Sequence, residues 1–290
     1  MGKPTPFLFY DIYFKLINIK NMACGCGRSP DGCRGWHALT EEEFKIEYEA
    51  FLQEKEGKLR VTEVEHYTDS LFKFKLRKPD GFSFKAGEFT MINVEGAPKR
   101  AYSITSGPDD DFIEFYSIKV PNGPLTSILQ KIQVGDVVNV SDKTTGSLLV
   151  ENLTDGTDLW LLATGTGIAP FISMLCDPRT YERFENIHVM WSVREQKELD
   201  AFDSFLLGLG IDYVPIVTRD DNWNGVSQRI TTQIKDGIKL GSRTPDTDKV
   251  MICGNMDFNI EIRDMLKDRG WIEGSNRENG SLVLEKAFVG

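Results

Sequence analysis

The residues near the start of the chain that could bind a metal are three cysteines and a histidine, Cys24, Cys26, Cys33 and His37. Three thiolates and one imidazole are enough ligands for one tetrahedral metal ion or one binuclear iron–sulfur cluster. Zinc sites usually separate paired cysteines by more residues than Cys24 and Cys26 are separated here. The residues leave three interpretations open, namely a [2Fe-2S] cluster, zinc or no metal.

A second candidate site is the glycine-containing segment Thr164-Gly165-Thr166-Gly167, which follows the apolar run LWLLA. Such a turn, at the start of a helix, lets backbone N–H groups approach a phosphate. Pro170 stands where a dinucleotide fingerprint has its third glycine, and no acidic ribose ligand follows at the usual distance, which weakens a standard NAD site. A bare turn without a ligand stays an alternative.

A third candidate site lies in RAYSIT, where strand alternation predicts Arg100 and Tyr102 on one side and Ser103 on the other. A guanidinium for phosphate, a ring for stacking and a hydroxyl form a set suited to a flavin. A surface Arg beside a packed Tyr is the alternative. Further along, NGPLTSILQ places Thr126 and Ser127 in a first helical turn, which predicts another anion site.

The elements that must position these residues differ along the chain. Thr40 with Glu43 forms a capping box, and apolar residues at helical spacing then predict a helix from about 40 to 55. Short β-rich runs from about 59 to 153 indicate a small antiparallel barrel with one short helix. Alternating strands and helices from 158 onward predict a doubly wound parallel sheet, with LWLLA and VMICG as central strands.

Composition excludes several classes of protein. The 290 residues carry 34 Lys+Arg and 44 Asp+Glu, a net charge of −10, which argues against a nucleic-acid binder. Charged residues interrupt the apolar patches near the N-terminus, so we expect no signal peptide and a cytoplasmic protein. The uncharged run 159–176 contains glycines and Pro170 and predicts strand, loop and helix without membrane insertion.

Five motifs occur in an order and spacing that resemble the bacterial ferredoxin/flavodoxin–NADP reductases, from about residue 59 to 290. The motifs are RAYSIT, GPLTSILQ, ATGTGIAPF, CGNMDF and LEKAFVG. The resemblance implies an FAD-binding β-barrel followed by an NADP-binding α/β domain, with electrons passing between NADP(H), FAD and a ferredoxin or flavodoxin. We expect three parts, namely an N-terminal extension at 1–57, the FAD-binding barrel at 58–155 and the NADP-binding domain at 156–290. We also expect the protein to be a monomer.

The resemblance also assigns roles to residues in the barrel and the tail. Arg100 resembles the ligand of the FAD pyrophosphate, Tyr102 the ring stacked on the isoalloxazine, Ser103 the hydroxyl near flavin N5, and Thr126 a flavin phosphate ligand. Tyr102, Ser103, Cys253 and Glu285 form the implied catalytic set. The other implied cofactor-binding residues of the barrel and tail are Ala101, Gly123, Leu125, Ser127, Ala287 and Phe288.

Three arginines match the NADP site of that family, Arg194, Arg219 and Arg229. The resemblance makes Arg219 and Arg229 ligands of the 2′-phosphate, which favours NADP over NAD. A dianionic phosphate needs planar bidentate donors, whereas an NAD site places a carboxylate there. Any single arginine is more often an ordinary surface residue than a ligand. The family places Cys253 near the nicotinamide, and a buried strand-end cysteine is the alternative.

The N-terminal Cys/His group lies outside this resemblance. Its residue order resembles the CDGSH iron–sulfur motif, with a middle spacer two residues shorter and Arg34 in place of the Asp. Two alternative functions stay open. The chain could be the reductase component of a dedicated oxygenase or other redox partner, or a non-enzymatic flavin or metal redox sensor. Met22 could be the natural start of the chain.

Overall fold

The computed structural model describes residues 28, 34–120 and 122–286. The chain forms two compact units, Met1–Glu56 and Gly57–Gly290. Cys24, Cys26, Cys33, Ala287 and Phe288 lie outside the described residues.

The first unit contains a short 3-10 helix and one α-helix, η1 (Trp36–Ala38) and α2 (Glu41–Lys55). The predicted capping box is confirmed, because the Glu43 N–H donates to Thr40 Oγ1 at 3.3 Å and the Thr40 N–H donates to the Glu43 carboxylate at 2.9 Å. Phe44 and Phe51 pack edge-on against Trp36, with ring centroids 5.7 and 5.4 Å away. An aromatic cluster therefore holds η1 against α2.

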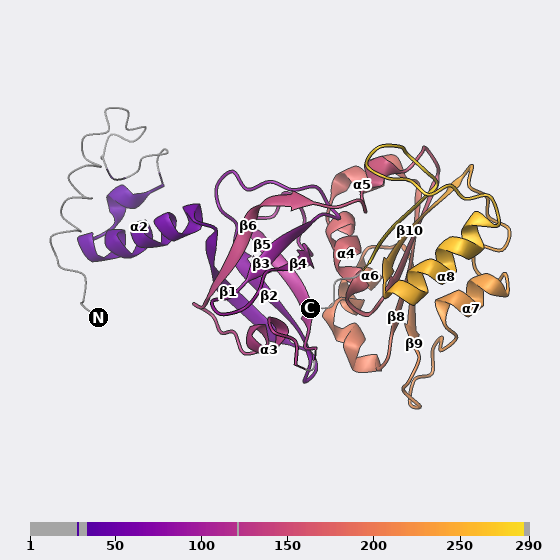
Figure 1. Cartoon of the computed structure of the whole chain (residues 1–290), viewed down its shortest axis with the longest axis horizontal. Coiled ribbons are helices and arrows are strands. Elements are labelled where there is room, and N and C mark those ends of the chain that lie inside the picture. The colour runs from indigo at the N-terminus through magenta and orange to yellow at the C-terminus, as the bar shows by residue number, and fades with distance from the viewer. Residues whose placement is uncertain (1–27, 29–33, 121, 287–290) are drawn as a thin grey trace. The chain divides into compact units, whose positions relative to one another are not determined.

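The second unit begins with a six-stranded antiparallel sheet in the order β4-β3-β6-β1-β2-β5 (Figure 1). Its elements are β1 (Lys58–His66), β2 (Leu71–Arg77), β3 (Phe89–Asn93), β4 (Arg100–Ser103), β5 (Phe112–Ile118), α3 (Thr126–Leu129) and β6 (Val137–Thr145). An antiparallel bridge between Ile104 and Phe115 brings the two edge strands together. The predicted antiparallel barrel with one short helix is confirmed.

The rest of the second unit is a five-stranded parallel sheet in the order β11-β10-β7-β8-β9. Its strands are β7 (Asp158–Thr164), β8 (Asn186–Val193), β9 (Asp212–Val217), β10 (Asp248–Gly254) and β11 (Leu282–Lys286). Its helices are η3 (Gly165–Ile168), α4 (Ala169–Leu175), α5 (Pro178–Arg183), η4 (Gln196–Ala201), α6 (Asp203–Gly208), α7 (Ile230–Lys235) and α8 (Met256–Lys267). Another 3-10 helix, η2 (Val150–Asn152), lies between β6 and β7.

The doubly wound sheet predicted from the sequence is confirmed, with β7 and β10 central and buried along their whole length or nearly so. One strand was missed. The segment treated as a C-terminal tail contains β11, which pairs in parallel with β10 from Val250↔Leu282 to Gly254↔Lys286. β11 has only five residues and lies near the chain end, and so short a pattern of apolar residues does not distinguish an edge strand from a tail.

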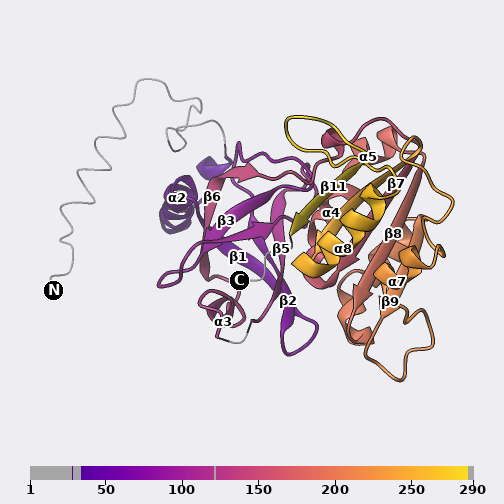
Figure 2. The same ribbon diagram turned by 45° about the vertical axis from the view of Figure 1, so that its right-hand side comes forward.

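The two faces of the parallel sheet bury different cores (Figure 2). On β7, Leu159 and Leu161 face a core that includes α4, whereas Trp160 and Leu162 face the core covered by α7 and α8. The first core also contains barrel residues such as Tyr116 and Leu148. The barrel and the sheet therefore share one continuous apolar core. No helix in the described part of the chain is long and apolar enough to span a membrane.

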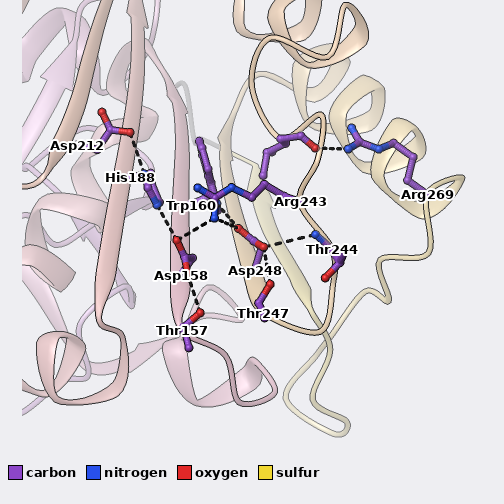
Figure 3. A network of polar contacts seen from close by, with 11 residues as sticks. Thr157, Asp158, Trp160, His188, Asp212, Arg243, Thr244, Thr247, Asp248 and Arg269 are labelled. Atoms are coloured by element: carbon purple, nitrogen blue, oxygen red, sulfur yellow. Dashed lines mark hydrogen bonds and ion pairs between the residues drawn. The ribbon is translucent and has the colours of Figure 1, made fainter.

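A charged network joins four strands at the amino edge of the parallel sheet (Figure 3). The two ring nitrogens of His188 lie 2.8 Å from the Asp212 carboxylate and 3.0 Å from the Asp158 carboxylate. Arg243 donates to Asp158 at 3.2 Å and lies 3.5 Å from the buried Asp248. His188 thus contacts charged groups on β7 and β9.

The pKa of Asp158 is lowered in this network. Burial by itself raises the pKa, but hydrogen bonds from His188, Thr157 and Asn186 and the charge of Arg243 lower it by more. A carboxyl whose pKa is depressed by folding stabilises the fold above its unfolded pKa, and this contribution is lost as the pH falls through the folded pKa.

We predict that Asp158→Asn lowers the free energy of unfolding by about 2 kcal/mol at pH 7, because it removes a carboxylate that His188 and Arg243 share. Urea unfolding measures the difference from wild type, which shrinks as the pH falls below about 4. Asp212→Asn is the matched control. Its half-exposed carboxylate contributes less than about 1 kcal/mol. An equal loss at pH 3 and pH 7 contradicts this role of Asp158.

Candidate active site

A cavity of about 760 Å³ opens at the carboxyl edge of the parallel sheet. Residues at or just after the ends of four strands line it, including Thr164, Val193, Thr218 and Asn255. The chain runs from β7 through β8 to β9 on one side and then returns to β10 on the other side of β7. Ligands of doubly wound sheets bind where the strand order reverses in this way.

Gly165 and Gly167, in the segment Thr164–Gly167, are glycine for different structural reasons. Gly165 has φ +53°, a conformation that favours glycine, and no atom lies within 4 Å of where its Cβ would stand. Thr164, Gly165 and Thr166 line the cavity. A Cβ on Gly167, in contrast, would lie 2.1 Å from the Cys253 carbonyl oxygen. Gly165 thus leaves open space at the cavity, whereas Gly167 permits close packing against the end of β10.

Three arginines predicted to bind the nucleotide line the same cavity, although they are far apart in the sequence. Arg194 follows β8, Arg219 follows β9 and Arg229 precedes α7, and all three are exposed. The Arg219 N–H donates to the Arg194 carbonyl at 2.8 Å, which ties the two loops together. Among the described residues, no carboxylate holds any of the three in an ion pair. The guanidinium groups are available to an anionic ligand.

Cys253 lies at the carboxyl end of β10 and is fully buried. Burial raises the pKa of its thiol well above the usual value, and the negative charge of Glu285 raises it further. The side chain is therefore a neutral thiol near pH 7 and is not an activated nucleophile. Any contribution to chemistry rests on its position at the strand end.

The barrel motif occupies β4, where Arg100, Ala101 and Ser103 are half-buried. The Tyr102 side chain is 7% exposed, and its hydroxyl lies 3.0 Å from Ser117 Oγ. Its ring packs edge-on against Phe115 with centroids 6.1 Å apart, and burial raises the pKa of its phenol. The ring belongs to the barrel core, and its stacking on a flavin stays a prediction.

The predicted anion site near α3 is a tight turn. Thr126 is fully buried and its hydroxyl accepts the Val120 N–H at 3.2 Å, while Leu125 is buried and Ser127 is half-buried. A Cβ on Gly123 would lie 2.2 Å from Thr126 Oγ1, so the turn requires glycine there. The Thr126 hydroxyl is thus used within the turn, and its phosphate contact stays a prediction.

Of the four proposed N-terminal metal ligands, the structure describes His37 alone, which is exposed within η1. The three cysteines lie outside the described residues. Within the described part of the chain, no group of three or more His, Cys, Asp or Glu side chains is arranged to hold a metal ion.

Sequence reasoning missed two parts of the cavity wall. The turn Thr68–Leu71 between β1 and β2 contributes from the barrel, and Asn255, Met256 and Asp257 contribute from the start of α8. Asn255 caps α8 by accepting the Phe258 N–H at 3.0 Å. An Asn directly before an amphipathic run was a readable N-cap signal, but nothing in the sequence placed the barrel turn there.

Comparison with known proteins covers both halves of the second unit. The model of the oxidoreductase FAD-binding domain matches residues 58–145, and the model of the oxidoreductase NAD-binding domain matches residues 161–263. The flavodoxin/ferredoxin–NADP reductase of Rhodobacter capsulatus is 40% identical over 251 residues, which is 79% of this chain and 92% of that protein. This chain belongs to the ferredoxin/flavodoxin–NADP reductase family.

Two further relatives agree with this family. The ferredoxin–NADP reductase of Pseudomonas aeruginosa is 40% identical over 252 residues, covering 79% of this chain and 96% of that protein. A crystal structure of a ferredoxin NADP⁺ reductase from Neisseria gonorrhoeae, with bound FAD and NADP, superposes with a TM-score of 0.75 and is 32% identical. It covers 80% of this chain and 98% of its own. The first of the two family-model matches begins at residue 58, after the first unit.

For this reductase we predict that Arg219→Ala combined with Arg229→Ala raises the Michaelis constant for NADPH by about 100-fold. If both arginines bind the 2′-phosphate, each substitution removes a charged hydrogen bond to it. The Michaelis constant for NADH changes less than about threefold. Steady-state kinetics with both nucleotides measures the split. Lys235→Ala, at the exposed end of α7 and outside the cavity lining, serves as a control. Equal effects on NADPH and NADH contradict the assignment.

Proposed function

We propose that this chain moves electrons between NADP(H) and a ferredoxin or flavodoxin, with FAD as its cofactor. The observation that supports the proposal most is that three available arginines and an open glycine turn line one cavity at the carboxyl edge of the parallel sheet. The core of that sheet continues into the barrel. Relatives with about two-fifths identical residues are named for this activity.

The residues at the cavity fit NADP(H). Arg219 and Arg229 offer planar donors for the 2′-phosphate, and Arg194 adds a further positive charge near the same wall. Gly165, whose missing Cβ leaves open space, allows a phosphate to approach the turn before α4. Cys253 is fully buried against Gly167 at the end of β10 and is not among the residues that line the cavity. Its uncharged thiol suits the uncharged dihydronicotinamide ring of NADPH.

The residues of the barrel fit FAD less completely. Arg100 donates to the Lys99 carbonyl through Nη1, so its other guanidinium nitrogens can bind a pyrophosphate. Ser103 ends β4 half-buried and can donate a hydrogen bond to the ring system. When bound, FAD supplies the exchange between a two-electron hydride and single electrons. We propose 58–155 as the FAD domain and 156–290 as the NADP domain, after an extension of 1–57.

An acidic ferredoxin or flavodoxin needs a local basic surface, because the chain itself carries a net charge of −10. Of the basic residues closest in sequence to the FAD motif, Lys75 is paired with Glu63 at 2.9 Å, and Lys78 donates to the carbonyls of Pro108 and Asp110. Lys99 is exposed beside Arg100. Lys99 is thus the better candidate for contact with the acceptor, because Arg100 is proposed to bind the FAD pyrophosphate.

We expect the purified protein to contain flavin and to reduce a ferredoxin or a flavodoxin with NADPH. Coupled reduction of a terminal dye measures the rate, with NADH and a flavin-free sample as controls. Reduction of an artificial acceptor without reduction of any ferredoxin or flavodoxin points to a dedicated partner. No NADPH-dependent reduction of any acceptor contradicts an enzymatic function.

The Cys/His metal site, the monomeric state and the cytoplasmic location stay predictions. If the Cys/His group holds a metal, we expect anaerobically purified protein to contain about two irons and two acid-labile sulfides per chain, or about one zinc per chain, because the four ligands complete one binuclear cluster or one tetrahedral ion. Changing Cys24, Cys26 and Cys33 to Ser removes the metal and leaves the flavin content unchanged. Elemental analysis and a sulfide assay measure both, and metal-free wild type contradicts the site.

A further inference from the structure

Arg219 and Arg229 lie at the two ends of the loop that joins β9 to α7, and both line the cavity. The segment 220–228 between them contributes no residue to the cavity wall. Two exposed guanidinium groups bind one anion well only when the loop holds them at a suitable spacing. The contacts of the segment 220–228 therefore bear on nucleotide binding, although the segment is not part of the cavity wall.

The beginning of the loop is held to the neighbouring loop after β8. Asp220 Oδ1 accepts the Asn222 N–H at 3.0 Å, and Asp220 Oδ2 accepts the Gln196 N–H at 3.4 Å. The hydrogen bond from the Arg219 N–H to the Arg194 carbonyl joins the same two loops. Both oxygens of the Asp220 carboxylate thus accept backbone N–H groups, and the backbone of Arg219 is held beside that of Arg194.

The end of the loop is held by α7. The Gln233 side chain, which is 3% exposed, donates through Nε2 to the Gln228 carbonyl at 2.7 Å. The Gln233 N–H donates to the Arg229 carbonyl at 3.0 Å. The first turn of α7 therefore determines where the backbone of Arg229 lies.

Trp223 joins these two ends of the loop. Its N–H donates to the Asp220 carbonyl at 3.2 Å, and its indole Nε1 donates to the Val226 carbonyl at 2.9 Å. The same Val226 carbonyl accepts the Val217 N–H at 3.0 Å, and Val226 forms a parallel bridge with Ile216 of β9. The partly buried indole also packs against the apolar core that the barrel and the sheet share. One side chain thus attaches both halves of the loop to the sheet.

The indole also determines which residue the loop can carry at position 225. A Cβ on Gly225 would lie 2.4 Å from Cζ2 and 2.6 Å from Cε2 of Trp223. The φ angle of Gly225 lies outside the left-handed region, so its backbone conformation is open to other residues. The ring of Trp223, packed directly on the backbone of Gly225, is therefore what requires glycine here.

We propose that Trp223 is a positioning residue, whose indole closes the loop 219–229 and holds Arg219 and Arg229 at the spacing that the 2′-phosphate requires. This inference rests on the proposed function, in which the two arginines bind that phosphate. Trp223 is not among the residues that line the cavity, so it acts through the arginines. A loop that is closed before the nucleotide arrives does not have to be ordered on binding, which raises the affinity.

Isothermal titration of the flavin-loaded protein with adenosine 2′,5′-bisphosphate tests the positioning without turnover. Trp223→Ala binds about tenfold more weakly than wild type, because binding must now order the loop. Asn224→Ala, an exposed change on the same loop, is the matched control and binds like wild type. Equal affinities of Trp223→Ala and wild type overturn the proposal. Wild-type protein that does not bind the bisphosphate overturns the proposed 2′-phosphate site itself, and this inference with it.

Gly225→Ala tests the same contact from the other side. Its methyl group displaces the indole, so the affinity for the bisphosphate falls about as far as in Trp223→Ala. In the double variant the methyl group has no ring to displace, and the affinity equals that of Trp223→Ala alone. Losses that add in the double variant overturn the role of the indole, because they show that each substitution disturbs the loop independently.

Steady-state kinetics separates positioning from general damage to the domain. In Trp223→Ala the Michaelis constant for NADPH rises about tenfold and that for NADH stays within about twofold, since NADH has no 2′-phosphate. The value of kcat at saturating NADPH stays within about twofold, because the 2′-phosphate is not the reacting group. Equal changes for NADPH and NADH, or a large loss of kcat, overturn the positioning role.

Discussion

A hydrophobic core shared by the barrel and one face of the parallel sheet determines where each group of the site lies. Side chains from the barrel, among them Tyr67, Leu71 and Leu148, pack with Leu159 and Leu161 of β7 and with Phe171 of α4. All of them are less than a tenth exposed. Each fully buried side chain of this size contributes about 2 kcal/mol, so separating the two halves costs many such contributions. The residues proposed for the flavin and for the nicotinamide therefore belong to elements that one core packs together, and direct hydride transfer requires the two rings to be held close to each other.

Polar groups have different roles at the carboxyl edge and at the amino edge of the parallel sheet. At the carboxyl edge, the strands end in loops that carry arginines and a glycine turn, and the backbone of Gly167 packs directly on that of Cys253. At the amino edge, Asp158 and Asp248 are buried with partners from neighbouring strands and loops. Charge at the amino edge is satisfied within the protein, whereas positive charge at the carboxyl edge is left for a ligand. Polar groups thus stabilise one end of the sheet and bind at the other.

Glu285 places a carboxyl group at the junction between the barrel and the parallel sheet. Most polar contacts between the two halves involve neutral groups, such as the asparagines around Gly146, but Glu285 brings a carboxylate to the junction. A neutral side chain of the same shape would favour the fold at neutral pH, since burial raises the pKa of this carboxyl.

The sequence by itself determined the elements and the family. The capping box at Thr40, the apolar strands LWLLA and VMICG and the five ordered motifs predicted the helix, the sheet and the barrel, because these depend on local patterns and on short spacings. It also selected Arg194, Arg219 and Arg229, which the structure places around one cavity. Only the tertiary structure decided that Tyr102 packs into the barrel, that the turn Thr68–Leu71 lines the cavity, and that Glu285 contacts a backbone amide 138 residues away. Such contacts depend on how separate elements pack, and no local pattern in the sequence records them.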